Sequence, residues 1–171
     1  VATAWPYLAH ADRFIRWAAR TAVEHQPKAE WSARALTEKD PSIRVEALLA
    51  LARVGGICPT HRKPTDPPVE TSLRDRILNA LVEVDLEALD HERKLTLIRT
   101  AEITLARFGR PDDALVGKLV AKFDPHFPAK SFDMNWMLCE TLAYLQSPTV
   151  AAKGMALIAA APTQEEQIEY A

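Results

Sequence analysis

The sequence has little glycine and cysteine, no excess of basic residues and no long apolar run. Only five of its 171 residues are glycine and two are cysteine, whereas twelve are proline. No apolar stretch reaches the roughly 20 residues that a membrane-spanning helix needs, which argues against membrane insertion. The formal net charge is −2. Nucleic-acid-binding domains usually carry a strong basic excess, so the charge argues against a nucleic-acid partner.

The abundant residues favour helices. Ala, Leu, Glu and Arg are good helix formers, and the prolines mark turns between segments with helical periodicity. These segments cover about 12–24, 28–39, 40–52, 71–84, 91–108, 111–123, 131–146 and 148–160. Thr163 and Glu166 form a capping box that begins a further helix with only a turn or two left to run. We therefore expect an all-α fold of about nine helices, in a single domain over 1–171 that is a fragment of a larger protein.

Two of the segments are similar to each other in sequence. A shift of 28 residues (from 12 to 40) aligns Asp12 with Asp40, Ile15 with Ile43, Arg16 with Arg44, and Ala19 with Ala47. Each segment begins with an aspartate that can cap a helix, and a central alanine lets a neighbouring helix approach closely. Helices and turns that alternate in this way predict an α-α superhelix, a solenoid of HEAT-like or armadillo type.

Residues 57–69 interrupt this pattern. They contain four prolines and show no helical period, which predicts an extended loop that is long for a helix–helix connection. Cys58 and His61 in this loop offer a thiol and an imidazole. A metal site needs about four ligands, however, and no second pair with matching spacing is present, so we expect an ordinary loop. Whether Cys58 and Cys139 are free or joined stays open, and Cys139 is interpreted as a small buried hydrophobic residue.

The stretch 40–52 reads Asp-Pro-Ser-Ile-Arg-Val-Glu and continues as an alanine and leucine ladder. It resembles the second helix of HEAT-like repeats. In that family the arginine typically pairs with a carboxylate or backbone group of the adjoining repeat. The resemblance implies structural repeat roles for Asp12, Arg16, Asp40 and Arg44.

A wider resemblance runs through 12–20, 123–125, 128–131 and 161–168. Over these stretches the chain resembles the HEAT-repeat region of large secreted planctomycete-type proteins. Those proteins are haem-binding or dehydrogenase-like, with a β-propeller before the repeats and a cytochrome c domain after them. The resemblance implies a periplasmic or cell-envelope location. It also implies a non-catalytic scaffold that binds neighbouring domains of the same polypeptide or another protein. It implies no catalytic residue, metal or cofactor here, and the chain has no Cys-x-x-Cys-His motif for covalent haem.

A basic stripe supports an alternative function. Arg13, Arg16 and Arg20 share one helix face, and Trp17 lies beside them. HEAT-like DNA glycosylases resemble this pattern, since they hold a damaged nucleotide in a basic groove with Trp and Asp residues. The structural role of Arg16 and the negative net charge weigh against nucleic acid. In either case Arg13, Trp17 and Arg20 are a possible interaction surface.

The aromatic residues are expected to serve mainly in packing. Trp5, Trp17, Trp31 and Trp136 lie in or beside helices and can bury large areas between helix layers. Phe14 and Trp17, however, fall outside the apolar stripe of their own helix. We expect them to contact a preceding helix or a partner domain.

Overall fold

The computed structural model describes all 171 residues and contains nine α-helices and no strand, which confirms the predicted all-α fold. None of the helices is both long enough and apolar enough to cross a membrane. The chain divides into two compact units, Val1–Pro111 and Asp112–Ala171, and the single superhelical domain stays a prediction. The α-helices are α1 (Arg13–Glu24), α2 (Ser32–Thr37), α3 (Pro41–Gly55), α4 (Thr71–Val82), α5 (His91–Phe108), α6 (Asp113–Phe123), α7 (Phe132–Tyr144), α8 (Val150–Ala160) and α9 (Gln164–Tyr170).

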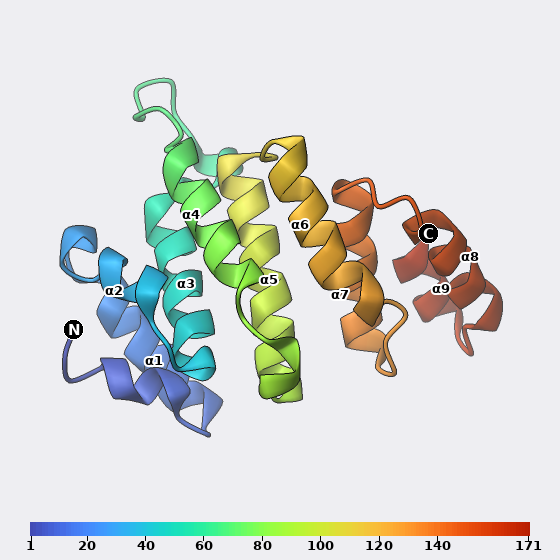
Figure 1. Cartoon of the computed structure of the whole chain (residues 1–171), viewed down its shortest axis with the longest axis horizontal. Coiled ribbons are helices and arrows are strands. Elements are labelled where there is room, and N and C mark those ends of the chain that lie inside the picture. The colour runs from blue at the N-terminus through green and yellow to red at the C-terminus, as the bar shows by residue number, and fades with distance from the viewer. The chain divides into compact units, whose positions relative to one another are not determined.

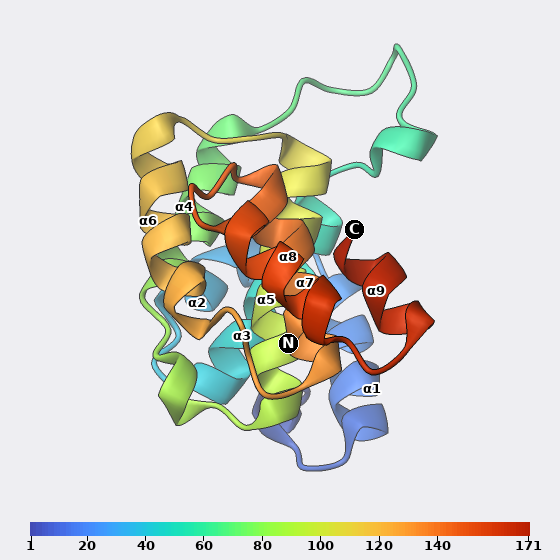
Figure 2. The ribbon, with the colours of Figure 1, turned by 90° about the vertical axis from the view of Figure 1, so that its right-hand side faces the viewer.

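The helices of the first unit pack in two layers. Figures 1 and 2 show α1, α3 and α5 in one layer, and α2 and α4 in the other. α3 is central, since it contacts α1, α2, α4, α5 and the short 3-10 helix η1 (Trp5–Ala9). Every residue from Val45 to Ala52 is buried. A run of alanine and leucine that is apolar all round suits a helix with neighbours on every side.

The second unit is built around α7, which contacts α6, α8 and α9, while α8 also packs on α9. Its core includes side chains from α6 and α7, among them Leu119, Phe123, Leu138 and Leu142. The capping box expected before the last helix is present in part, because the Thr163 hydroxyl accepts a hydrogen bond from the Glu166 N–H at 3.2 Å. That bond satisfies one of the unpaired N–H groups at the start of α9.

Aspartates cap the two similar helices as the sequence predicts. Asp12 Oδ1 accepts a hydrogen bond from the Phe14 N–H at 2.7 Å, at the start of α1. Asp40 Oδ1 accepts from Ser42 and Ile43 at 2.9 and 3.0 Å, at the start of α3. Each carboxylate satisfies N–H groups that have no partner within the helix, and its negative charge favours that end of the helix dipole.

The segment 28–39 differs from the single helix that we expected. A 3-10 turn, η2 (Lys28–Glu30), comes first, and α2 begins only at Ser32. Trp31 lies between them with a φ of −136° and is fully buried, and its indole Nε1 donates to the Gln26 carbonyl at 3.3 Å. Burying this large ring stabilises the unit more than one further turn of a short helix would.

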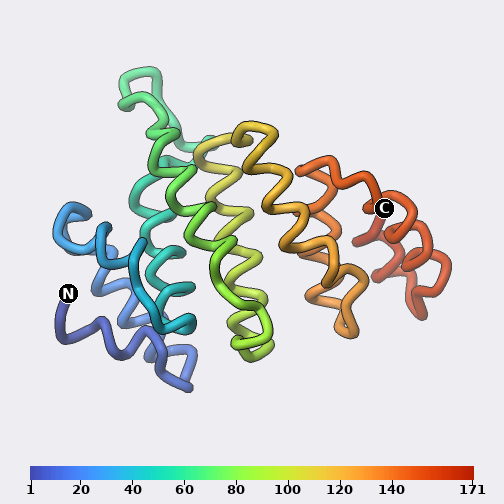
Figure 3. The backbone as a smooth tube through the Cα atoms, in the orientation of Figure 1, coloured from blue at the N-terminus to red at the C-terminus, as the bar shows by residue number.

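The Pro-rich loop joins α3 to α4 and extends beyond their ends (Figure 3). Its regular structure is one 3-10 turn, η3 (Pro59–His61). Hydrogen bonds close the rest of the loop, from the Lys63 N–H to Asp66 Oδ2 at 2.7 Å and from Arg62 to the Pro67 carbonyl. The loop therefore has a defined path, on which Arg62 is held by the main chain.

Candidate functional site

The three arginines that share a face of α1 lie in different surroundings. Arg16 is buried at 5% exposure, whereas Arg13 is exposed. The Arg20 side chain is 16% exposed. Of the three, only Arg13 therefore offers its cation freely to the solvent.

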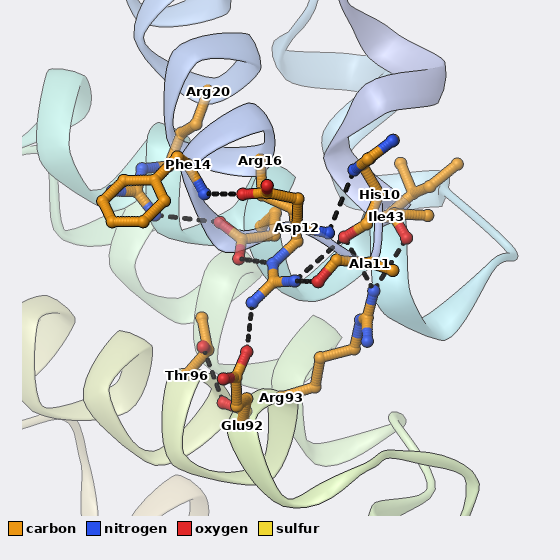
Figure 4. A network of polar contacts seen from close by, with 12 residues as sticks. His10, Ala11, Asp12, Phe14, Arg16, Arg20, Ile43, Glu92, Arg93 and Thr96 are labelled. Atoms are coloured by element: carbon orange, nitrogen blue, oxygen red, sulfur yellow. Dashed lines mark hydrogen bonds and ion pairs between the residues drawn. The ribbon is translucent and has the colours of Figure 1, made fainter.

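Arg16 lies at the centre of a network of polar contacts (Figure 4). Its Nη1 donates to the carbonyls of His10 and Ala11 at 2.9 and 2.7 Å, and its Nη2 donates to Glu92 at 2.5 Å. Its Nε lies 3.5 Å from Glu46 Oε1. Because these partners come from the end of η1 and from α3 and α5, Arg16 cross-links three elements to its own helix.

Glu46 of α3 is the buried carboxylate of this network, with a side chain that is only 4% exposed. Its Oε2 accepts from Arg20 Nη1 at 2.9 Å, and Arg20 Nε lies 3.5 Å from Glu24. Arg20 is thus less accessible than Arg13 and Trp17, and the interaction surface that groups the three residues stays a prediction. Two carboxylates hold the Arg20 guanidinium against α3 and its own helix. We call Arg16, Arg20, Glu46 and Glu92 the arginine network.

Arg44 occupies in α3 the position that Arg16 occupies in α1, and it too pairs with a later carboxylate. Its Nη2 donates to Glu83 at 2.6 Å, just after α4. Arg93 of α5 donates to the Ala9 carbonyl at 2.7 Å. These arginines connect helices that are distant in sequence, and their charges are engaged within the protein.

Phe14 and Trp17 of α1 are 65% and 58% exposed, in line with their place outside the apolar stripe. The Arg13 guanidinium lies over the Phe14 ring, 4.8 Å from its centre, as in a cation–π contact. Trp5 and Trp31 are fully buried, as expected for packing residues. Trp17 is not, so the packing role that we expected for all four tryptophans is corrected at that position.

An apolar groove of about 450 Å³ lies between η1 and α1. No charged side chain lines it. Ala18 and Ala22 of α1 are exposed there, and such small side chains let another helix approach closely. Ile15, also in the groove, is 39% exposed. We call Phe14, Ile15, Trp17, Ala18 and Ala22 the α1 surface.

The two cysteines are free and have opposite acid–base character. Hydrogen bonding with His61, and then with Thr60, lowers the pKa of Cys58 to about 7. Burial, and then the neighbouring Glu140, raises the pKa of Cys139, although its side chain is partly rather than fully buried, which corrects the buried position expected for it. No group of three or more His, Cys, Asp or Glu side chains is placed to hold a metal ion.

The second unit contains a polar cluster around Asp124 that sequence reasoning missed. Lys153 Nζ donates to Asp124 Oδ2 at 2.7 Å, and Ser147 Oγ donates to Oδ1 at 2.8 Å. Thr149 also donates to Oδ1. The bonds from Lys153 and Thr149 are the main reasons why the pKa of Asp124 falls to about 2. The cluster connects the end of α6 to the start of α8. The sequence signal that could have indicated it is the Ser-Pro-Thr turn at 147–149, whose hydroxyl groups can bind a nearby carboxylate.

These features define a helical protein whose helices are joined by buried arginine–carboxylate contacts and whose first helix exposes an apolar surface. A comparison of the chain with protein-family models, curated proteins and solved structures found no match. Function is therefore inferred from the exposed side chains and their surroundings.

Proposed function

We propose that this chain is a non-catalytic scaffold whose α1 surface binds a helix of a neighbouring domain, in the same polypeptide or in another protein. The observation that carries the proposal is the exposure of Phe14 and Trp17, at 65% and 58%, on the helix that also lines the groove with Ile15, Ala18 and Ala22. Large exposed apolar patches are uncommon on soluble monomeric proteins, and they often mark sites of interaction with another protein.

The chemistry of the α1 surface suits a helical partner. The exposed alanines let a second helix lie close to α1, and the neighbouring aromatic rings offer the large contact area that anchors an interface. Charged groups are depleted at the centre of such interfaces. Here Arg16 and Arg20 have carboxylate partners within the chain, and the groove is lined without charged side chains.

Helix α8 of the second unit offers additional apolar surface. Met155 is 63% exposed, and exposed alanines precede and follow it along the helix. A scaffold that holds more than one neighbouring domain needs more than one such surface. We therefore propose α8 as a secondary contact, independent of the α1 surface.

A cell-envelope location beside a redox domain belongs to the same proposal and rests on the resemblance to planctomycete-type haem-binding proteins. A pyridine-haemochrome spectrum tests it. We expect a c-type haem signal from the full native protein and none from the 171-residue chain. The lack of a signal from both would remove the basis for this location and would leave the α1 surface untouched.

Nucleic-acid binding is the alternative function, and the ion pairs of Arg16 and Arg20 give it less support. A titration of fluorescent duplex DNA at low and high salt separates the two functions. Binding that weakens with salt and with Arg13→Gln would favour the alternative, because phosphate contacts release counterions. We expect no such binding.

Photo-crosslinking tests the proposed function directly. Benzoylphenylalanine replaces Trp17 in cells that make the protein, and in a parallel sample it replaces the exposed Glu165. We expect crosslinks from position 17 to a defined peptide, identified by mass spectrometry, and few from position 165. Adding Ala22→Glu should lower the yield from position 17 by about tenfold, because a charge enters the centre of the interface.

The matched control is Ala121→Glu, which makes the same change on an exposed position of α6. It should leave the crosslinks intact. Equal yields from positions 17 and 165, or a yield that Ala22→Glu does not change, would overturn the proposal.

A further inference from the structure

A cleft of about 330 Å³ lies beneath the Pro-rich loop, at the carboxyl ends of α3 and α5. Val54 and Val69 form part of its apolar wall, together with the nearly buried ring of Phe108. Ligand clefts commonly enclose roughly 300–1,000 Å³ and combine apolar walls with a few polar groups. This cleft is at the small end of that range, which suits a ligand with a single ring.

The backbone at Gly56 packs closely against the Phe108 ring. A Cβ at position 56 would lie 2.6 Å from Phe108 Cε2 and 2.8 Å from Arg107 Cβ, so only glycine fits without displacement. This close contact fixes Phe108 in the wall. It also places the Arg107 side chain beside the end of α3.

The charges of the cleft do not balance. Lys28 pairs with Glu70 at 2.9 Å, so these two residues compensate each other. Arg62 and Arg107 also line the cleft, and neither has a carboxylate partner. Two guanidinium groups without a carboxylate partner thus line one cleft, in a chain whose net charge is −2.

The existing hydrogen bonds leave part of each guanidinium unused. Arg107 uses Nη1, which donates to the carbonyls of Arg53 and Gly56, the latter at 2.7 Å, and so caps the end of α3. Arg62 uses Nη2, which donates to the Pro67 carbonyl. A guanidinium has five N–H donors, so each arginine keeps donors for an anion.

We propose that this cleft binds a small organic carboxylate. Its carboxylate accepts hydrogen bonds from Arg62 and Arg107, whose planar guanidinium groups match it in shape and charge. Its apolar body lies against Phe108 and the two valines. The proposal is independent of the α1 surface, which lies on other residues.

A titration of the 171-residue chain with phenylacetate, followed by NMR, tests this proposal. The chain has only five glycines, so the amide signals of Gly55 and Gly56 can be followed readily in the cleft. Gly117 and Gly154 serve as internal controls in the second unit. We expect saturable shifts at Gly55 and Gly56 and none at the two controls.

Three comparisons decide the outcome. Arg62→Gln should weaken the binding of phenylacetate by about tenfold through the loss of a charged hydrogen bond, whereas Arg13→Gln should leave it unchanged. Phenylacetamide, which has the ring without the charge, and inorganic phosphate, which has the charge without the ring, should both bind at least about tenfold more weakly. Equal binding of either compound, or the absence of saturable shifts with phenylacetate, would overturn the proposal.

Discussion

The arginine network and the arginines of the cleft show two uses of the same side chain within one unit. In the network, Arg16 and Arg20 share the buried Glu46, and their charges are compensated inside the protein. In the cleft, Arg62 and Arg107 bind only main-chain carbonyls. The difference lies in the partner rather than in the arginine. A carboxylate turns the guanidinium into a structural cross-link, and its absence leaves the charge available for a ligand.

The largest effect is expected in the arginine network. Glu46→Gln should lower the free energy of unfolding by about 3 kcal/mol, because the buried Arg16 and the partly buried Arg20 lose the carboxylate that they share. Urea denaturation measures it. Glu92→Gln is the matched control, since Glu92 contacts the same Arg16 but its side chain is 60% exposed. Glu92→Gln should lower the free energy of unfolding by less than about 1 kcal/mol. Equal losses would contradict the distinction between buried and exposed partners.

The Asp124 cluster extends the comparison to a partly buried aspartate–lysine pair in the second unit. The pKa of Asp124 falls from 3.8 to about 2 on folding, mainly through the hydrogen bond from Lys153. A lowered folded-state pKa means that the stabilisation is complete above the unfolded value and is lost as the pH falls from about 4 to 2.

Asp124→Asn should therefore lower the free energy of unfolding at neutral pH by about 1–2 kcal/mol, after allowance for partial exposure. It should also reduce the loss of stability that accompanies a fall in pH, which we call the acid limb. Hydrogen exchange in α6 and α8 at several pH values measures both effects. Glu169→Gln makes the same charge change at an exposed site and should alter neither. An unchanged acid limb in Asp124→Asn would show that this carboxylate does not couple stability to pH.

At the cleft, the expected change in stability comes from packing rather than from charge. Gly56→Ala should lower stability by about 1–2 kcal/mol, because the new methyl group meets Phe108 and Arg107. Gly117→Ala, inside α6 where nothing lies within 4 Å, should raise it by about 0.5–1 kcal/mol. Thermal unfolding of the two variants gives opposite signs. A Gly56→Ala variant as stable as the parent chain would mean that the wall of the cleft yields easily.

Local sequence rules predicted much of this fold. The period of apolar residues located the helices, and Asp12 and Asp40 cap α1 and α3 because capping depends on neighbours two or three residues away. The same rules failed at Trp31, where burial of the ring overrides the helix expected over 28–39.

The functional surroundings were harder to predict, because they depend on distant partners. The spacing of Arg13, Arg16 and Arg20 showed that they share a face, but it could not show that Glu46 and Glu92 meet that face from other helices. The place of Trp17 outside the apolar stripe indicated a contact beyond its own helix, and the structure leaves its side chain 58% exposed. The charge imbalance of the cleft could not be predicted from the sequence, since it arises where the Pro-rich loop and the end of α5 meet.

Hydroxyl-radical footprinting of α1 tests the central claim, that the α1 surface is covered by a partner. The 171-residue chain and the protein as its cells make it are oxidised side by side, and the modification of Trp17 and Phe14 is compared. Trp5, which is 1% exposed, serves as the internal standard and should be protected in both samples. We expect Trp17 and Phe14 to be modified readily in the 171-residue chain and to be protected in the cellular protein. Equal modification of Trp17 in the two samples would contradict that claim.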